Sequence, residues 1–163
     1  MTQKTYAFIS SIMTAFLVAA FLAAAPLGDQ SAMAKTPVPS LNLSQSGLAL
    51  RGYDPVAYFT AGKPVKGSTD ITLRHGGGTY HFSTEQNRNA FQSNPAKYLP
   101  QYGGFCSYGA AANYKVDGDP KVWNIVDGKL YLNINKSIDR SWDRRRGFYI
   151  KKANSNWPKI KDR

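Results

Sequence analysis

The feature that most constrains the fold of this chain is a pair of short β-prone runs separated by Asp-Gly. Residues 122–126 (Val-Trp-Asn-Ile-Val) and 129–133 (Lys-Leu-Tyr-Leu-Asn) flank Asp127 and Gly128. A tight two-residue hairpin turn of type I′ needs positive φ at both central positions, and an Asp-Gly pair meets that need. The pattern therefore predicts a β-hairpin whose apolar side chains pack into a core. These apolar residues are Trp123, Leu130 and Leu132.

A second hairpin is expected where three glycines separate residues 71–74 from residues 79–82. Strand alternation puts His81 on the face opposite Tyr80 and Phe82. No Gly-Lys-Ser/Thr follows the glycines, so a turn is favoured over a phosphate-binding loop.

Capping residues predict short helices between and after the hairpins. Asp54-Pro55 begins a helix that ends before Gly62. Ser83 and Gln86 form a capping box that opens a helix through Phe91. Asn94-Pro95 starts another short turn of helix.

The C-terminal segment predicts one helix from Ser137, with Ile138, Trp142 and Tyr149 on a single apolar face. Gly147 should weaken the middle of that helix by about 1 kcal/mol. The chain then closes with the segment 156–158. No internal repeat is visible in the sequence. The predicted fold class is α+β: one small domain of two β-hairpins with short helices packed on them and a basic C-terminal helix.

Residues 1–34 are typical of a signal peptide. Lys4 precedes an apolar run over 6–27, and Ala32-Met33-Ala34 supplies the small residues that signal peptidase requires. The alternative is an uncleaved membrane anchor, although polar residues and Pro26 interrupt the run. Cleavage after Ala34 would leave residues 35–163, and we expect this chain to be exported to the periplasm. Residues 35–47 are rich in Pro, Ser and Asn and predict a flexible lead-in, and residues 48–163 form the domain.

Composition excludes several classes of site. A single cysteine rules out an internal disulfide framework and a multi-cysteine zinc cage, and two histidines rule out a three-histidine metal centre. The net charge of +11 would suit nucleic acid, but an exported protein would not meet that partner.

Several motifs follow one another in a specific order and spacing: Gly52-Tyr53-Asp54-Pro55-Val56-Ala57-Tyr58-Phe59, Gly62–Gly67, Tyr80-His81-Phe82-Ser83, Phe91, Asn94–Pro100, Gln101–Cys106, Trp123, Asp127–Asn133 and Trp157-Pro158. This set of motifs resembles the YHS-domain family of small bacterial proteins over about 51–158. Within that family the chain looks like the exported, stand-alone branch.

The resemblance implies a binding domain, because YHS modules also occur in copper-transporting ATPases and some hydroxylases and are presumed to bind metal. The metal-associated versions read Phe-Cys-x-x-x-Cys after the histidine. In this chain the two cysteine places hold Ser83 and Asn87.

His81 and Cys106 are the strongest ligand types left for a metal site. Together an imidazole and a thiolate would favour copper or zinc over hard cations. The plainer alternatives are that His81 is a hydrogen-bonded structural histidine and that Cys106 is a buried small thiol. A third alternative is that Cys106 is a redox-active thiol or pairs with another molecule. A Cys–His nucleophile would need an orienting group, for which Asp54 is the candidate, but nothing in the spacing joins the three. The residues favour a non-catalytic protein.

Ten Lys and Arg residues against three Asp residues lie in 136–163. A solvated helix face is the plainer reading, and binding to an acidic protein or an anionic membrane surface is the functional one. The candidate partner-binding residues are Arg144, Arg145, Arg146, Lys151 and Lys152. We therefore expect an exported, non-catalytic YHS-type binding domain for a soft metal or small ligand. The alternative is a cofactor-free interaction module that uses the basic helix; no oligomeric state is favoured.

Overall fold

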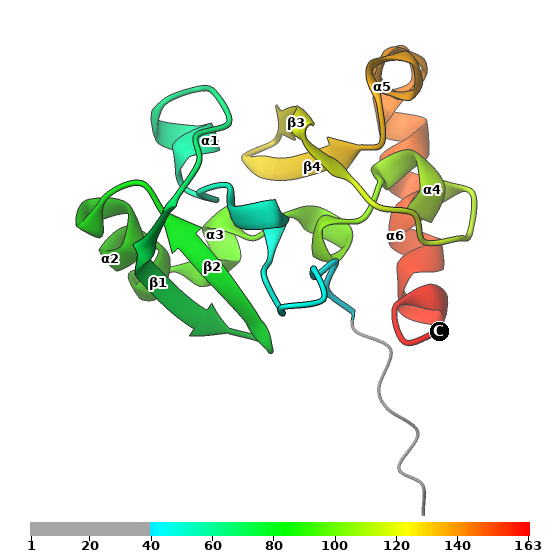
Figure 1. The fold of residues 1–163 in the computed structure, drawn as a ribbon. Helices are drawn as coiled ribbons and strands as arrows, with labels where there is room; N and C mark the ends of the chain where they lie inside the picture. Colours follow the sequence, from blue (N-terminus) through cyan, green and yellow to red (C-terminus); the bar gives the residue numbers. More distant parts are fainter. Residues whose placement is uncertain (1–39) are drawn as a thin grey trace, which may run out of the picture. The chain divides into compact units, whose positions relative to one another are not determined.

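The computed structural model describes residues 40–163, so the predicted signal peptide over 1–34 lies outside the described residues. In chain order the elements are η1 (Leu50–Gly52), α1 (Ala57–Thr60), β1 (Ser68–His75), β2 (Gly78–Phe82), α2 (Glu85–Ser93), α3 (Pro95–Tyr98), η2 (Gln101–Gly104), α4 (Ser107–Ala111), β3 (Asp119–Val126), β4 (Lys129–Asn133), α5 (Lys136–Asp143) and α6 (Arg146–Ile160) (Figure 1). The predicted α+β class is confirmed. Within this range, no helix combines the length and apolar character that crossing a membrane requires.

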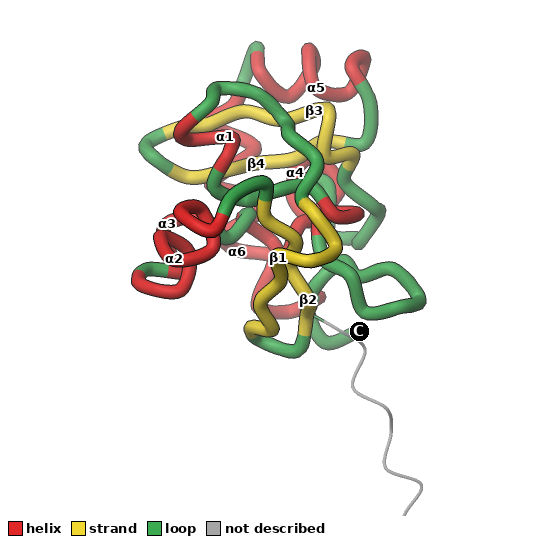
Figure 2. The backbone as a smooth tube through the Cα atoms, turned by 60° about the vertical axis from the view of Figure 1, so that its left-hand side comes forward, coloured by secondary structure: helices red, strands yellow, loops and turns green. Residues whose placement is uncertain are grey.

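Both predicted hairpins form, each as a two-stranded antiparallel sheet, β1 with β2 and β3 with β4 (Figure 2). Asp127 has φ 51° and Gly128 has φ 70°, as the predicted turn requires. Tyr80 and Phe82 are buried on one face of β2, and His81 is half-buried on the other. The alternation expected for this strand is therefore confirmed.

The two hairpins have the same register, 51 positions apart. In the first, Ser68 pairs with Phe82, the ladder is interrupted, and pairing resumes from Thr72 to His75. In the second, Asp119 pairs with Asn133, and pairing resumes from Trp123 to Val126 after the same interruption. Every partner in the second hairpin thus has a counterpart in the first.

The correspondence extends to the flanking elements. Thr84 and Asn135 are both N-cap residues whose side chains accept a backbone hydrogen bond three positions later, at the starts of α2 and α5. The helices that follow, α3 and α6, also begin 51 positions apart. We call residues 48–98 the first repeat and residues 100–149 the second repeat. The structure therefore contains an internal repeat that the sequence does not display, and the end of α6 extends beyond it.

Buried aromatic side chains hold each repeat together. Phe91 on α2 packs against Tyr80 and Phe82, with ring centroids 4.9 Å and 5.3 Å away. Its counterpart on α5 is Trp142, whose ring centroid lies 5.5 Å from that of Tyr131. Full burial of such side chains contributes about 1.5–3 kcal/mol each, so each helix is fixed on its hairpin mainly through this one residue.

A third cluster joins the two repeats. Leu50 and Tyr58 from the first repeat pack with Leu130 and Leu132 from the second, and all four are buried. The hydroxyl of Tyr58 also donates a 2.8 Å hydrogen bond to the carbonyl of Pro120. Leu130 and Leu132 are core residues as predicted, whereas Trp123 is only partly buried and packs at the edge of this cluster, with its ring centroid 5.3 Å from that of Tyr58.

Two helix predictions were wrong in detail. The N-cap of α2 is Thr84, whose hydroxyl accepts the 3.1 Å hydrogen bond from Asn87 N, so the capping box at Ser83 does not form. The single C-terminal helix is in fact two helices, because the chain breaks at Arg144 and Arg145 between α5 and α6.

Two further C-terminal positions differ from expectation as a result. Gly147 lies in the first turn of α6 rather than in the middle of a helix, and the segment 156–158 lies inside α6.

The described part of the predicted lead-in, residues 40–47, lies alongside η2. The backbone N–H of Asn42 donates to Gly103 O at 2.8 Å, and its side-chain amide donates to Gly104 O at 3.2 Å. This stretch is therefore hydrogen-bonded to the second repeat.

Candidate functional site

The carboxylate of Asp54 is the most heavily hydrogen-bonded acidic group at the start of the first repeat, and the residue is fully buried. Its Oδ1 accepts from the backbone N–H of Val56 at 2.8 Å and of Ala57 at 3.3 Å. These two donors are the free backbone N–H groups at the start of α1. Asp54 therefore binds the turn that leads into α1, but the predicted N-cap position is wrong, because α1 begins only at Ala57 and its N-cap residue is Val56.

The second oxygen of Asp54 binds the junction between β2 and α2. Oδ2 accepts from the backbone N–H of Ser83 at 2.8 Å, from the Ser83 hydroxyl at 2.7 Å, and from the side-chain amide of Asn87 at 2.7 Å. Charge-assisted hydrogen bonds of this length are roughly twice as strong as neutral ones. We call Asp54, Ser83 and Asn87 the Asp54 cluster.

A groove of about 370 Å³ lies beside the Asp54 cluster. We call it the first groove. Its lining comes from α1, α2 and the turns before them: Val56, Ala57, Thr60, Ala61, Val65, Ser83, Thr84, Gln86, Asn87 and Ala90. Ser83 and Asn87 reach the groove edge but direct their donors to Asp54.

Cys106 occupies in the second repeat the place of Asp54 in the first. Cys106 comes directly after Phe105, which forms an isolated β-bridge with Asp117. In the same way, Asp54 comes directly after Tyr53, which forms an isolated β-bridge with Lys66. The thiol is 1% exposed, and its Sγ donates to Oδ1 of Asn133 at 3.5 Å.

Asn133 connects this thiol to a carboxylate. Its Oδ1 also accepts from the backbone N–H of Tyr108 at 3.2 Å, and its Nδ2 donates to Asp139 at 3.0 Å. Asn124 donates to the same Asp139 oxygen at 2.7 Å. The thiol is therefore held by an amide and not by an imidazole.

A second groove, of about 260 Å³, has Cys106 in its wall. The other lining residues are Tyr108, Tyr114, Val116, Ile134, Asn135 and Ile138. Val116, Ile134, Asn135 and Ile138 lie 51 positions after Val65, Ser83, Thr84 and Asn87 of the first groove. The two grooves are thus equivalent places in the two repeats, and the first has more polar side chains in its lining than the second.

His81, the other predicted metal ligand, lies in the first repeat. A Cβ atom at Gly52 would come 3.4 Å from its Nδ1, which places the imidazole against η1. Neither His81 nor Cys106 is a hydrogen-bond partner of the other within residues 40–163, and no three His, Cys, Asp or Glu side chains in that range are grouped to hold a metal ion. The His81–Cys106 metal site stays a prediction.

Buried tyrosines are the groups whose ionisation the fold changes most. Burial raises the pKa of Tyr80 from 10.0 to about 12. Burial, followed by the charges of Tyr53, Asp119 and Asp54, raises the pKa of Tyr58 further. Both hydroxyls therefore stay protonated and contribute packing, not acid–base chemistry, near neutral pH.

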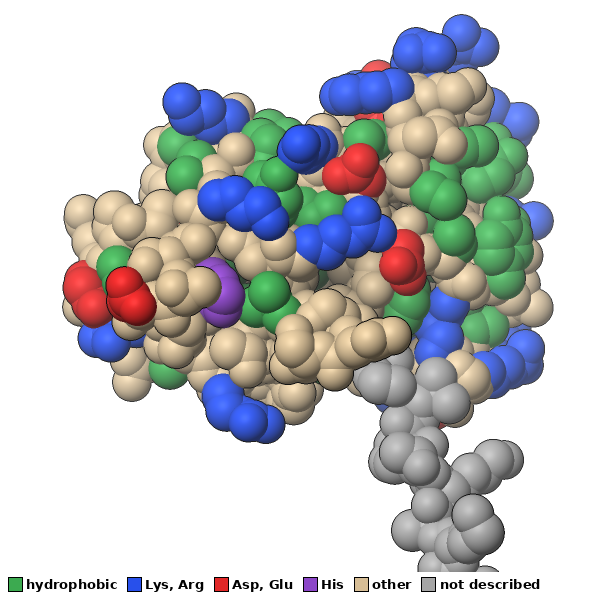
Figure 3. Space-filling model, in the orientation of Figure 1, with side chains coloured by type: hydrophobic (Ala, Val, Ile, Leu, Met, Phe, Trp, Pro, Cys, Tyr) green, Lys and Arg blue, Asp and Glu red, His purple; other side chains and the backbone are tan. Residues whose placement is uncertain are grey.

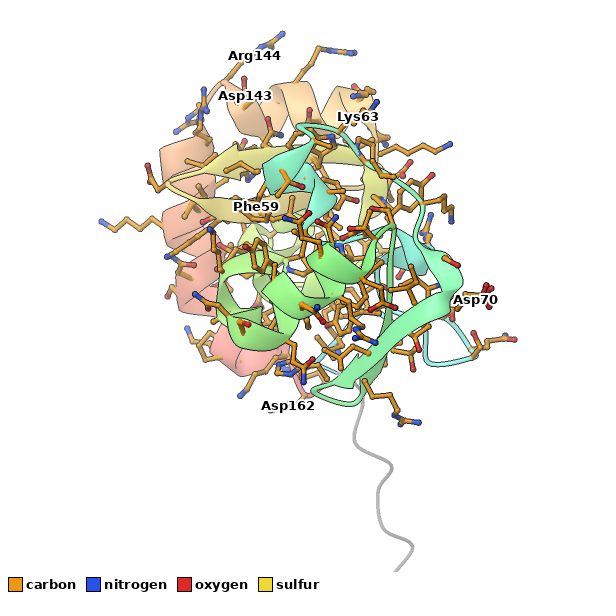
Figure 4. The ribbon with its side chains drawn as sticks, turned by 90° about the vertical axis from the view of Figure 1, so that its left-hand side faces the viewer. Phe59, Lys63, Asp70, Asp143, Arg144 and Asp162 are labelled. Carbon is orange, nitrogen blue, oxygen red and sulfur yellow. The ribbon has the colours of Figure 1, made fainter. Side chains whose placement is uncertain are left out.

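The predicted basic surface is formed by α5 and α6. Lys and Arg side chains lie over α5 and along α6 (Figure 3), and Arg144 projects outward from the junction of the two helices (Figure 4). Phe148 is 45% exposed between two cations, with the Arg145 guanidinium 4.5 Å and the Lys152 ammonium 5.6 Å from its ring centroid. Arg146 forms an ion pair with Asp143 at 3.3 Å. We call Arg144, Arg145, Phe148 and Lys152 the basic–aromatic surface.

A family model for the YHS domain matches residues 56–102. Residues 56–102 are therefore a YHS domain. The match begins at Val56, just before α1, and ends within η2, so it contains most of the first repeat and includes neither Asp54 nor Cys106. No curated protein and no solved structure matches the chain.

The YHS domain of this chain does not offer the donors that a soft metal needs at Ser83 and Asn87. Hydroxyl and amide groups replace thiolates there, and both already donate to the Asp54 carboxylate. A metal in this place would have to displace a network of five hydrogen bonds centred on the buried Asp54 carboxylate. The residues therefore do not fit a thiolate-bound metal.

Sequence reasoning assigned Asp54 only to the cap of α1 and missed its contact with α2. The available signal was the spacing of Ser83 and Asn87, which puts two hydrogen-bonding side chains on one face of a helix start. A buried acceptor for that pair could have been sought among the few acidic residues of the first repeat.

Proposed function

We propose that this chain is an exported, non-catalytic YHS-type binding domain whose cargo is a small molecule. The observation that carries the proposal is the Asp54 cluster. Its hydrogen bonds engage Ser83 and Asn87 at the edge of the first groove, while the equivalent positions in the second groove are apolar and have no such internal partner. Export is supported by the signal-like residues 1–34.

A non-catalytic role is supported by the surroundings of the thiol. A nucleophilic cysteine needs a base within hydrogen-bond reach, and in the described residues the partner of Cys106 is the Asn133 carbonyl oxygen. That oxygen accepts a proton only as a hydrogen bond and does not activate the thiol. We therefore interpret the second groove, which has Cys106 in its wall, as a binding site.

Native mass spectrometry of the exported protein tests this function. The spectrum should show a small molecule bound to the chain that begins at Lys35, and elemental analysis of the same sample should show no stoichiometric copper or zinc. A stoichiometric metal that disappears in the Cys106→Ser variant would favour the His81–Cys106 site and overturn the proposal.

A second function is favoured by the basic–aromatic surface. Exposed basic side chains beside an exposed aromatic ring suit an anionic lipid surface, since the cations attract the headgroups and the ring enters the interface. The supporting observation is Phe148, which remains 45% exposed between Arg145 and Lys152. Co-sedimentation with anionic vesicles tests it, and retention only by an acidic protein would instead identify the other predicted partner.

A further inference from the structure

The two equivalent grooves differ at the positions that decide their chemistry. In the first groove Ser83 and Asn87 are polar and turn toward the Asp54 carboxylate. In the second groove the same positions hold Ile134 and Ile138, and the place of the carboxylate holds the Cys106 thiol. The same backbone arrangement therefore presents an apolar wall instead of a hydrogen-bond network.

The second groove also collects exposed apolar side chains. Three large apolar residues are exposed in residues 40–163: Tyr114 at 51%, Ile134 at 38% and Phe148 at 45%. Tyr114 and Ile134 both line the second groove. Exposed apolar groups that meet at a concave place are typical of ligand sites, because a ligand removes them from water.

The groove lining specifies the class of ligand. It contains no charged side chain, so the ligand is neutral. Tyr108, Tyr114 and the thiol offer aromatic and sulfur contacts, which favour a ring. A volume of about 260 Å³ lies below the range of about 300–1,000 Å³ that holds drug-sized ligands, so the ring system is small.

One polar group at the groove can orient such a ring. The side-chain carbonyl of Asn135 accepts the backbone N–H of Ile138 at 2.9 Å, which fixes the side chain at the start of α5. Its amide nitrogen is then the donor that remains for an oxygen atom of the ligand.

We propose that the second groove binds a small neutral aromatic molecule that carries one hydrogen-bonding oxygen. This inference rests on the proposed binding function and names the ligand class and the site. The uncharged lining, its two tyrosine rings and its small volume select this occupant.

The test uses 2-naphthol as the probe and the sole cysteine as the reporter. Calorimetry should show one molecule bound per chain, and bound 2-naphthol should slow alkylation of Cys106 by N-ethylmaleimide. The variant Ile134→Ser/Ile138→Asn gives the second groove the polar residues of the first, and it should weaken binding roughly tenfold or more, because two polar groups would be desolvated.

Phe148→Ser is the matched control, since it removes the other exposed apolar side chain and leaves the groove intact. It should bind 2-naphthol like the wild type. If the double variant does not fold, Ile134→Ser alone replaces it, because Ile134 is exposed. Equal binding by wild type and groove variant, absence of binding, or a wild-type dimer that the groove variant dissociates would each overturn the assignment.

Failure of this site is distinguishable from failure of the proposed function. A different small molecule found on the exported protein by native mass spectrometry would keep the binding function and remove the aromatic ligand. A stoichiometric metal without any bound small molecule would remove both.

Discussion

The side-chain amide of Asn87 donates a 2.7 Å hydrogen bond to Oδ2 of Asp54, although 33 positions separate the two residues. This contact fixes the start of α2 against the start of α1, since the other oxygen of Asp54 binds the turn that leads into α1. The resemblance places a cysteine of the metal-associated versions at position 87, whereas here the Asn87 amide binds a buried carboxylate that links the starts of the two helices.

Substitution Asp54→Ala should lower the free energy of unfolding by more than about 3 kcal/mol. It would leave the partly buried donors of Ser83 and Asn87 and the backbone donors of Val56 and Ala57 without this acceptor, and each loss at a buried group costs about 1–3 kcal/mol. Urea denaturation measures the effect. Asp70→Ala, at an exposed position on β1, is the control and should stay within about 0.5 kcal/mol of wild type. Equal midpoints for the two variants would show that the Asp54 cluster does not stabilise the fold.

The internal repeat predicts paired effects at Gly67 and Gly118. A Cβ atom at Gly67 would overlap the backbone of His81, and one at Gly118 would lie 2.6 Å from Gly104 O and 2.8 Å from the Cβ of Leu132. Alanine at either position should therefore cost about 1–3 kcal/mol. Thermal unfolding of the two variants checks the equivalence.

Gly147→Ala is the opposite case and serves as the control for these glycines. A Cβ atom there meets nothing within 4 Å, and the residue is helical. The substitution should raise the free energy of unfolding by about 0.5–1 kcal/mol. A destabilised Gly147→Ala protein would contradict the position of α6.

Buried tyrosines predict a loss of stability at alkaline pH. The pKa of Tyr80 is about 12 in the folded protein, against about 10 in the unfolded chain. Between these values the unfolded chain loses its proton while the folded protein keeps it, so the free energy of unfolding falls as pH rises. The contribution of Tyr80 is complete below pH of about 10 and falls by roughly 1.4 kcal/mol per pH unit above it.

Tyr80→Phe should make this alkaline decline shallower, because burial alone shifts the tyrosine and phenylalanine keeps the packing. Denaturation midpoints from neutral pH to about pH 12 measure the slope. An unchanged slope would mean that Tyr80 is accessible to hydroxide in the folded state.

Binding to anionic vesicles should depend on salt and on α5 and α6. The variant Arg144→Ala/Arg145→Ala/Arg146→Ala should lose about 1 kcal/mol of binding free energy for each residue that contacts the lipid. Raising the salt concentration should weaken wild-type binding steeply. The control Lys63→Ala/Arg74→Ala/Lys97→Ala removes the same charge from exposed places in the first repeat and should retain binding. Binding that ignores both salt and the arginine changes would exclude the basic–aromatic surface.

Local signals in the sequence predicted the hairpins but not their repetition. Asp127-Gly128 and the glycines at 76–78 specify turns through backbone geometry, which neighbouring residues determine. The repeat was hidden because its equivalent residues differ in chemistry: Phe91 corresponds to Trp142, and Asp54 to Cys106. Once the register is seen, the break between α5 and α6 repeats the break between α2 and α3 at Asn94.

The site was less accessible from the sequence than the fold. The residue types of His81 and Cys106 suggested a shared metal site, but proximity depends on how the two repeats pack, which no local pattern encodes. The contact of Asp54 with Ser83 and Asn87 likewise joins segments that are 29 and 33 positions apart. The basic residues of α5 and α6 were identified directly, because charge and exposure follow from composition and helical spacing.

The central claim is that the Asp54 cluster forms internal hydrogen bonds and that the bound cargo is a small molecule and not a metal. Chelator competition with Cu(I) and Zn(II) tests this claim most directly. The purified protein, Cys106→Ser and Asp54→Asn should compete equally weakly with a chromophoric chelator, with no stoichiometric tight site. One equivalent of metal bound tightly by the wild type and lost in either variant would contradict the account.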